Sequence, residues 1–314
     1  MSLYFDNKDA FLEPTVTQHG SHMVMTNVSK STKKKYINID TRFRDEFINN
    51  QVANYTIILP QRVNEVKNIN ITNIEIPNSI YNISSNNGNH SFYIEYVDIS
   101  LNEVTLYRTV LLDNGNYEST TSLKDNIHSQ IITNFDSRLS FTLSNGYYKL
   151  SVPESVSQLY NLNVNFNVDG SGNYDRSNLS SKLGWLLGFR KASYVLKAGD
   201  VLTAEALPDL NGARYLYLAI DEFGKGNQHS FVSPLSNSFI NKNIIARIAM
   251  DNTTYGFGKI HHVNRENGTL ISDKRNYSGK IDLQKLNVQL LNEYGNPVNL
   301  NGLDFSFCME LEHE

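Results

Sequence analysis

The sequence predicts an all-β fold, a single β-sandwich with a large inserted α/β elaboration and an extended N-terminal arm. Tyr (18 residues) and Phe (15) are abundant, whereas Pro (7) is scarce. Short apolar runs with period-two alternation are separated by clusters of Asn, Gly, Asp and Ser, which is typical of strands and turns. Roughly 280 residues follow the arm, more than the roughly 100 to 180 that one sandwich needs, so we expect an insertion.

The C-terminal segment shows the alternation most clearly. Apolar residues occupy every second position in two runs, as a strand with one buried and one wet face requires. Residues 293–297 between the runs have the composition of a turn. We therefore predict a terminal β-hairpin whose last strand is held inside a sheet. The alternating residues are Leu286, Val288 and Leu290 in the first run, and Phe305, Phe307, Met309 and Leu311 in the second.

Residues 1–35 are predicted to form the arm. They are polar, lack periodicity and cannot build a core of their own. Such an arm becomes ordered only by lying on another surface, which favours an assembly. Three consecutive lysines at its end are interpreted as a solvated flank rather than a phosphate contact. The assembly residues that we predict in this arm are Tyr4, Phe5, Phe11, Leu12, Lys33, Lys34 and Lys35.

Residues 36–113 are predicted to begin the sandwich. The offset between Ile71 and Ile74 breaks the alternation and indicates a β-bulge at Thr72-Asn73. Pro60 and Pro77 are each expected to end a strand, where a missing N–H does least harm. The predicted strands are residues 36–40, 55–59, 69–76, 92–96 and 104–107.

Residues 114–210 have a different texture and are predicted to be the inserted domain. Apolar residues at helical spacing predict a helix over 121–134, capped by Ser119 or Thr120. Asn145-Gly146 is placed as a hairpin turn, and a second short helix is expected over 179–189. Strand texture returns at 214–220, so residues 211–314 complete the sandwich. The strands predicted within the insertion are residues 139–143, 147–150 and 162–166.

Charge and cysteine content restrict the functional classes. The formal net charge is −4 and the pI is near 6.1, which gives no overall attraction to nucleic acid, so we expect no direct sequence-specific binding to it. No run approaches the eighteen apolar residues of a membrane span, so no transmembrane segment is expected. The single cysteine, Cys308, excludes an internal disulfide and is expected on the face of Glu310.

The sequence contains no persuasive catalytic constellation, so we predict no enzyme, no cofactor and no metal site. His261 and His262 are adjacent on a strand and point to opposite faces, which makes a shared ion awkward. The run of Asp40, Arg42, Arg44 and Asp45 is interpreted as a salt-bridge network that ties the arm to the first strand. Gly224-Lys-Gly226 lacks the spacing of a phosphate-binding loop.

Three aromatic residues of the insertion are candidate ligand contacts, namely Trp185, Tyr147 and Tyr148. They could stack on a sugar ring. Core packing is the favoured interpretation of Trp185, because Leu183, Leu186 and Leu187 crowd the same segment. The two tyrosines are likewise good strand formers.

Five strings in this order and spacing resemble the minor jelly-roll capsid proteins, including penton proteins, of nucleocytoplasmic large DNA viruses and virophages. The resemblance runs from about residue 36 to 311. It implies a jelly-roll β-sandwich, often with an inserted domain, that is built into an icosahedral shell and carries no catalytic residues. The strings are residues 36–44 (YINIDTRFR), 74–78 (IEIPN), 115–117 (GNY), 182–189 (KLGWLLGF), and 286–295 followed by 301–307.

The sequence thus predicts a structural virion protein, a homopentameric penton at the five-fold vertex. Its expected partners are further copies of itself and neighbouring major capsid proteins, and it is expected in the virion capsid after synthesis in the host cytoplasm. A first alternative is another minor or cement capsid protein. A second alternative is a module that binds a host glycan or receptor through the insertion.

Overall fold

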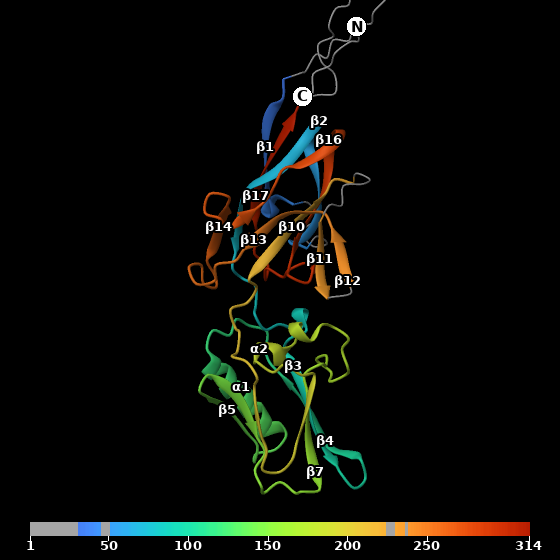
Figure 1. Ribbon diagram of the computed structural model, residues 1–314. Coiled ribbons are helices and arrows are strands. Elements are labelled where there is room, and N and C mark those ends of the chain that lie inside the picture. Colours follow the sequence, from blue (N-terminus) through green and yellow to red (C-terminus); the bar gives the residue numbers. More distant parts are fainter. Residues whose placement is uncertain (1–30, 45–50, 224–229, 236–237) are drawn as a thin grey trace, which may run out of the picture.

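The computed structural model describes residues 31–44, 51–223, 230–235 and 238–314. The chain forms two lobes stacked end to end, with the C-terminus in the first lobe (Figure 1). Predicted arm residues Tyr4, Phe5, Phe11 and Leu12 lie outside the described residues, as does Asp45.

The first lobe contains most of the long strands. Its elements are β1 (Lys33–Asp40), η1 (Thr41–Phe43), β2 (Asn54–Pro77), β10 (Tyr215–Asp221), β11 (Ser230–Leu235), β12 (Ser238–Lys242), β13 (Ile244–Ala249), β14 (Ile260–Asn264), β15 (Leu270–Ile271), β16 (Arg275–Leu291) and β17 (Ser306–His313). Lys33, Lys34 and Lys35, which we predicted in the arm, therefore begin β1, where each pairs with a residue of β17.

The second lobe contains shorter elements. They are η2 (Ser85–Asn87), β3 (Ser91–Asp98), β4 (Glu103–Leu111), α1 (Thr120–Asn134), β5 (Ser140–Ser144), β6 (Tyr147–Ser151), β7 (Tyr160–Asn165), η3 (Leu179–Ser181), α2 (Leu183–Leu186), β8 (Ser193–Leu196) and β9 (Val201–Thr203). All strand pairs between named strands in both lobes are antiparallel among the described residues.

The strand order of the first lobe is that of a jelly roll. Strand β2 has 24 residues and serves both halves of the curled sheet. Its first part pairs with β16 at residues 54–58, and its last part lies between β17 and β14. The halves are β1-β17-β2-β14 and β2-β16-β10-β13. With β2 counted as two strands, the orders are 1-8-3-6 and 2-7-4-5, which makes an eight-stranded jelly roll. The prediction of an all-β jelly roll is confirmed.

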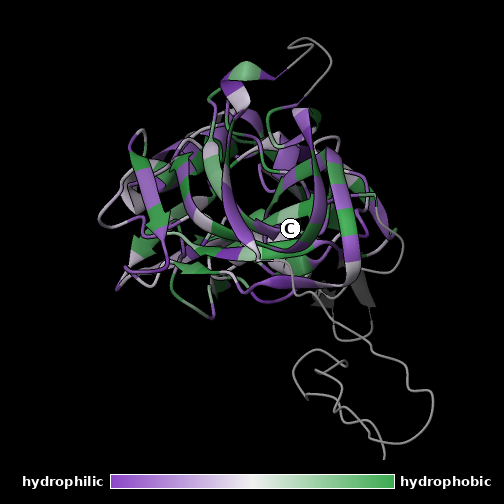
Figure 2. Cartoon of the chain, turned by 90° about the horizontal axis from the view of Figure 1, so that it is seen from above, coloured by the Kyte–Doolittle hydropathy of each residue, from purple (hydrophilic) through white to green (hydrophobic). Residues whose placement is uncertain are grey.

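The alternating apolar residues of the C-terminal segment lie in the core of the first lobe, as predicted. Leu286, Val288 and Leu290 are fully buried, as are Met309 and Leu311. Hydrophobic and hydrophilic residues alternate along the strands when the lobe is seen end on (Figure 2). Burial of one face of each strand supplies the main stabilisation of this lobe.

The predicted terminal hairpin is wrong. β16 and β17 do not pair with each other, because β2 lies between them and pairs with both. The local turn does form: the Asn292 side chain accepts hydrogen bonds from the backbone N–H groups of Tyr294 and Asn296 at 3.0 Å each. However, the returning chain pairs with β16 only around Pro297 and Val298 before it crosses to the other half.

Two local predictions about β2 had different outcomes. The bulge is confirmed, since Cys308 pairs with Asn73 and Met309 with Ile71, which leaves Thr72 as the extra residue. The prediction that Pro60 ends a strand is wrong, although Pro77 does end β2. The pairing of β2 with β16 shifts register between residues 58 and 63. The missing N–H of Pro60 therefore falls in an irregular stretch.

The second lobe surrounds a separate core. Its four-stranded sheet has the order β4-β3-β7-β8 and its three-stranded sheet the order β5-β6-β9. Helix α1 agrees with the prediction, and the Ser119 side chain caps it by accepting from the N–H of Ser122 at 3.2 Å. Asn145 (φ 53°) and Gly146 (φ 82°) form the expected hairpin turn. The expected helix over 179–189 is reduced to η3 and α2.

The inserted segment is longer than predicted. We placed 36–113 in the sandwich, but β3 and β4 belong to the sheet of the second lobe, where β3 pairs with β7. Their buried residues share the core that runs from Ile83 to Ala204, against which Leu210 packs. We therefore propose residues 83–210 as the inserted domain. The strand pattern alone is the same for either sheet, so it could not locate this boundary.

Candidate functional site at the junction of the lobes and on the outer surfaces

The chain crosses between the lobes at residues 78–82 and 210–214, and asparagine side chains hold these crossings together. The Asn78 Nδ2 donates to Asn252 Oδ1 at 3.2 Å and to the Tyr255 carbonyl at 2.8 Å. The Asn252 Nδ2 donates to the carbonyl oxygens of Asn211 at 2.5 Å and Ala213 at 3.1 Å. The loop after β13 is thus fastened to both crossings.

Asn82 joins the two crossings directly. Its Nδ2 donates to the carbonyls of Tyr117 at 2.9 Å and Leu210 at 2.7 Å. Its Oδ1 accepts from the Tyr117 N–H at 2.9 Å. The side chain is buried, so these bonds are protected from competition with water. Nothing in the period-two or helical patterns marks this residue, which lies five positions after Pro77 at the end of β2.

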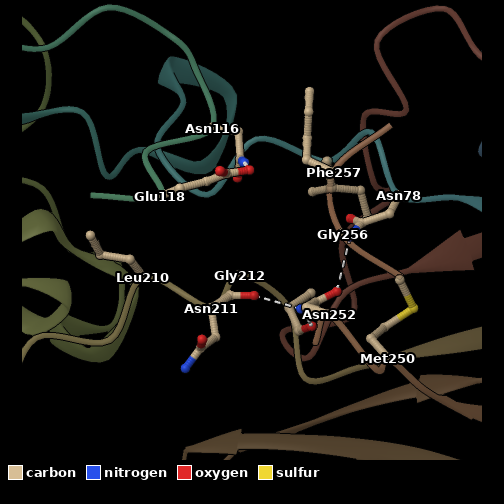
Figure 3. A pocket seen from close by; sticks show the side chains of 12 residues that line it. Asn78, Asn116, Glu118, Leu210, Asn211, Gly212, Met250, Asn252, Gly256 and Phe257 are labelled. Atoms are coloured by element: carbon tan, nitrogen blue, oxygen red, sulfur yellow. Dashed lines mark hydrogen bonds between the residues drawn. The ribbon is translucent and has the colours of Figure 1, made fainter. Parts of the chain in front are cut away.

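A cavity of about 200 Å³ lies beside these amides (Figure 3). Asn116 and Glu118 line it from the second lobe, and Met250, Asn252 and Phe257 from the first. The Asn116 Nδ2 donates to Glu118 Oε1 at 3.1 Å. The lining holds one carboxylate and several amides that already have partners, so its geometry favours a structural joint over a reaction centre.

A buried lysine fixes the loops of the second lobe. The Lys182 side chain is fully buried and pairs with the Asp175 carboxylate. Its Nζ also donates to the carbonyls of Gly88 at 3.3 Å and Val168 at 3.4 Å. The hydrogen bond from Lys182 lowers the pKa of Asp175 to about 2. Two loops, the one at Gly88 and the one that contains Val168 and Asp175, therefore converge on one cation.

A second buried ion pair lies in the first lobe. Arg275 Nη1 lies 2.5 Å from Glu222 Oε1, to which the Tyr277 hydroxyl also donates at 2.6 Å. Burial raises the pKa of Tyr277. Arg275 further donates to the carbonyls of Ile220 and Asn243, at 2.8 Å each. These bonds tie β10 to β16, which is a structural role.

The predicted ligand contacts do not form one site. Trp185 is half-buried, and the Arg190 guanidinium lies 4.1 Å from its ring centroid. Tyr147 is half-buried on β6, but its neighbour Tyr148 is fully buried and donates to the Thr120 carbonyl at 2.7 Å. Tyr148 therefore packs in the core, on the face of β6 opposite to that of Tyr147, because adjacent residues of a strand point to opposite faces.

The charged residues at and just after the end of β1, interpreted from the sequence as a salt-bridge network, form local ion pairs. The Arg42 Nη2 lies 2.5 Å from Asp40 Oδ2, and this hydrogen bond lowers the pKa of Asp40. Arg44 pairs with Asp304 at 2.6 Å. These contacts join η1 to the end of β1 and to the segment before β17.

The two adjacent histidines of the sequence lie on β14. His261 is buried and His262 is exposed, on opposite faces of β14. Within residues 31–44, 51–223, 230–235 and 238–314, no group of three or more His, Cys, Asp or Glu could hold a metal ion. The same residues contain no helix with the length and apolar character of a membrane span.

No protein-family model matches the chain, and no curated protein matches it. The solved structures that are similar to this chain include a crystal structure of the mavirus penton protein and a 3.5 Å cryo-electron microscopy structure of the Sputnik virophage.

Both similarities span most of this chain, but the sequence identity and the TM-score are low. The mavirus penton protein has 11% identity and a TM-score of 0.40, over 91% of this chain and 100% of that one. The Sputnik structure has 10% identity and a TM-score of 0.40, over 89% of this chain and 98% of that one. Matches at this level do not assign a function, so the functional proposal rests on this chain's own strand order and surfaces.

Proposed function

We propose that the protein is a structural capsid protein of a virion, and that it acts through its geometry. The main support for this proposal is the complete jelly roll of the first lobe. The connection between its strands β2 and β10 contains the whole second lobe. The jelly roll is an architecture of viral capsid domains, as well as of lectins and cupins. It closes its own core and leaves its outer faces available for packing against neighbours.

The edge at β1 supports assembly. β1 pairs with β17 on one side, and no described strand pairs with its other edge. Tyr36 on this strand is exposed. Lys34 forms an ion pair with Glu310 at 3.0 Å, which stays within the lobe. An open edge can accept a strand from another chain.

The finer proposal is a homopentameric penton at the five-fold vertex, beside major capsid proteins. One jelly roll per chain is compatible with a ring in which each subunit uses two different faces. The sequence preceding β1 contributes Tyr4, Phe5, Phe11 and Leu12 as the apolar anchors proposed to bind neighbouring subunits. The proposal places the protein in the virion after synthesis in the host cytoplasm, and it assigns no catalytic or cofactor-binding residue.

Native mass spectrometry and cryo-electron microscopy of particles test this proposal. We expect a species of five times the 35.7 kDa chain mass and density for the jelly roll around the five-fold axes. Deleting residues 1–30 should weaken the pentamer while leaving the circular dichroism of the sheet unchanged. Density beneath or between other capsomers supports the cement alternative instead. A monomer at high concentration that is absent from particles contradicts any capsid role.

Glycan or receptor binding by the second lobe is a second candidate, and one surface favours it. On the outer face of the four-stranded sheet, the rings of Tyr93 and Tyr107 lie 6.0 Å apart. Glu95 pairs with Tyr107 in register and accepts a hydrogen bond from Asn163 at 3.0 Å. The exposed ring of Tyr107 and the half-buried ring of Tyr93, beside a carboxylate and an amide, suit a sugar. Binding on a glycan array that Tyr107→Ala abolishes, and Trp185→Ala preserves, supports this surface.

A further inference from the structure

Four large aliphatic side chains are exposed together at one end of the second lobe. The exposed fractions are 51% for Ile99, 65% for Leu101, 49% for Val104 and 59% for Leu159. Ile99 and Leu101 lie on the β3–β4 turn, Val104 at the start of β4, and Leu159 just before β7. The backbone N–H of Ile99 donates to the Leu159 carbonyl at 2.9 Å, so the two segments touch. We name these four residues the apolar tip.

The apolar tip points away from the first lobe. The free ends of β4 and β7 lie at the far end of the molecule from the C-terminus (Figure 1). The projecting β3–β4 hairpin and the neighbouring segment before β7 form this end (Figure 1). Scattered apolar residues are normal on a surface, but a convergent group at the far end of a projecting lobe indicates contact with an apolar partner.

The turn that presents the apolar tip is fixed in advance. The Asp98 carboxylate accepts from the N–H and hydroxyl of Ser100, at 2.8 and 2.5 Å, and from the Leu101 N–H at 3.2 Å. Asn102 takes a left-handed conformation with φ 54° and its N–H donates to the Asp98 carbonyl at 2.8 Å. These hydrogen bonds make the turn without the side chains of Ile99 or Leu101. The exposed aliphatic side chains are therefore unnecessary for folding of the turn.

We infer that the apolar tip inserts into the surface of a lipid bilayer of neutral net charge. Four exposed side chains fall short of the roughly 800 Å² that each partner contributes to a standard protein interface. Hydrocarbon accepts such a group without a matching surface, and shallow insertion needs no spanning helix. This inference goes beyond the proposed capsid role and does not depend on it.

Charge around the apolar tip selects the kind of bilayer. Asp98 and Glu103 border the β3–β4 turn, and Glu154 lies before Leu159. Residues 97–105 and 153–162 contain no Lys or Arg. Arg138 donates to the Ser155 carbonyl at 3.0 Å, but its charge is paired with that of Asp136 at 2.7 Å. Acidic borders are repelled by anionic headgroups, which attract basic segments instead. The tip therefore suits zwitterionic lipids such as phosphatidylcholine.

Vesicle flotation of the full chain tests the inference. We expect the protein to float with phosphatidylcholine vesicles, and to float less when phosphatidylserine is added at low salt. Leu101→Asp should lower the partition coefficient by about tenfold or more. Leu303→Ser is the matched control, because Leu303 is 46% exposed but belongs to the first lobe, and it should float as the wild type does.

Folding and self-association are measured on the same samples. Circular dichroism should show that Leu101→Asp keeps its strands, and Ile99→Ser provides a milder variant that retains the Asp98 turn. Absence of flotation with either vesicle contradicts the inference, as does wild-type flotation of both tip variants. A change in sedimentation of Leu101→Asp without lipid binding by the wild type identifies the tip as a contact between copies, which also overturns it.

Discussion

The two lobes bury different kinds of side chain. The first lobe packs aliphatic residues from long strands, and β2 alone contributes eight buried hydrophobic residues that run from Tyr55 to Ile76. The second lobe packs an aromatic cluster, in which the ring centroid of Phe166 lies 5.4 Å from that of Phe92 and 4.9 Å from that of Phe189. Stability of the first lobe thus depends on strand register, whereas that of the second depends more on a few large aromatic side chains. Both lobes also contain a buried ion pair, Arg275–Glu222 in the first and Lys182–Asp175 in the second.

Truncating the aromatic cluster should have the largest effect. We expect Phe166→Ala to lower the free energy of unfolding of the second lobe by about 3–5 kcal/mol, because it removes a buried ring and leaves a cavity. Trp185 is the only tryptophan and belongs to the second lobe, so its fluorescence during urea denaturation reports on that lobe. Phe43→Ala, at an exposed position, should change the free energy by less than about 0.5 kcal/mol.

The same experiment sharpens the contrast between the lobes. If Phe166→Ala shifts the tryptophan transition and leaves a separate circular dichroism transition in place, the two cores unfold independently. A single transition that shifts as a whole indicates that the junction couples them.

Removing the buried cation should have the next largest effect. We expect Lys182→Met to lower the free energy of unfolding by about 3 kcal/mol at pH 7, because Asp175 loses its partner. The pKa of Asp175 is lowered to about 2 in the folded chain, so the stabilisation from its charged form is present above the unfolded pKa near 3.9 and is lost as pH falls toward 2.

Urea denaturation at several pH values checks this prediction. The difference between the wild type and Lys182→Met should shrink between about pH 4 and pH 2. Lys197→Met is the control, since Lys197 is exposed in the same lobe. A difference that stays constant across this range is inconsistent with an ion-pair origin.

Weakening the junction should have a smaller effect on stability. We expect Asn82→Ala to lower the free energy of unfolding by about 2 kcal/mol, because two carbonyls and one N–H lose their buried partner. Limited proteolysis should show faster cleavage near residues 210–214. Asn86→Ala, at an exposed position, should be cleaved at the wild-type rate. Unchanged cleavage of Asn82→Ala would show that other contacts suffice to hold the crossings.

Removing the helix cap should have the smallest effect. We expect Ser119→Ala to lower the free energy of unfolding by about 1 kcal/mol, since the N–H of Ser122 loses its acceptor. The exposed Ser122→Ala variant keeps that acceptor and should lie within about 0.5 kcal/mol of the wild type. Equal losses in both variants would argue against capping as the cause.

Local patterns predicted the buried faces but not the strand partners. The alternation from Phe305 to Leu311 correctly identified the inward side chains, because period two follows from strand geometry alone. The hairpin prediction failed because pairing with β2 involves residues more than two hundred positions away. The same limit explains β3 and β4, whose pattern fits either lobe.

The candidate functional residues were harder to predict. Adjacent residues of a strand point to opposite faces, so the sequence could have shown that Tyr147 and Tyr148 differ in exposure. Which of the two points inward depends on the position of α1. Asn82 and Lys182 carry no periodic signal, and their importance comes from loops that meet only in three dimensions. Sequence composition favours exposure for both residue types, so their burial is a tertiary effect.

The closeness of the two crossings has an evolutionary consequence. Because Asn82 bonds to Leu210 at 2.7 Å, the polypeptide departs and comes back at neighbouring points. A different domain could occupy this gap without moving any strand that follows it. Descendants of such a protein could exchange their outward-facing module while conserving the frame that carries it.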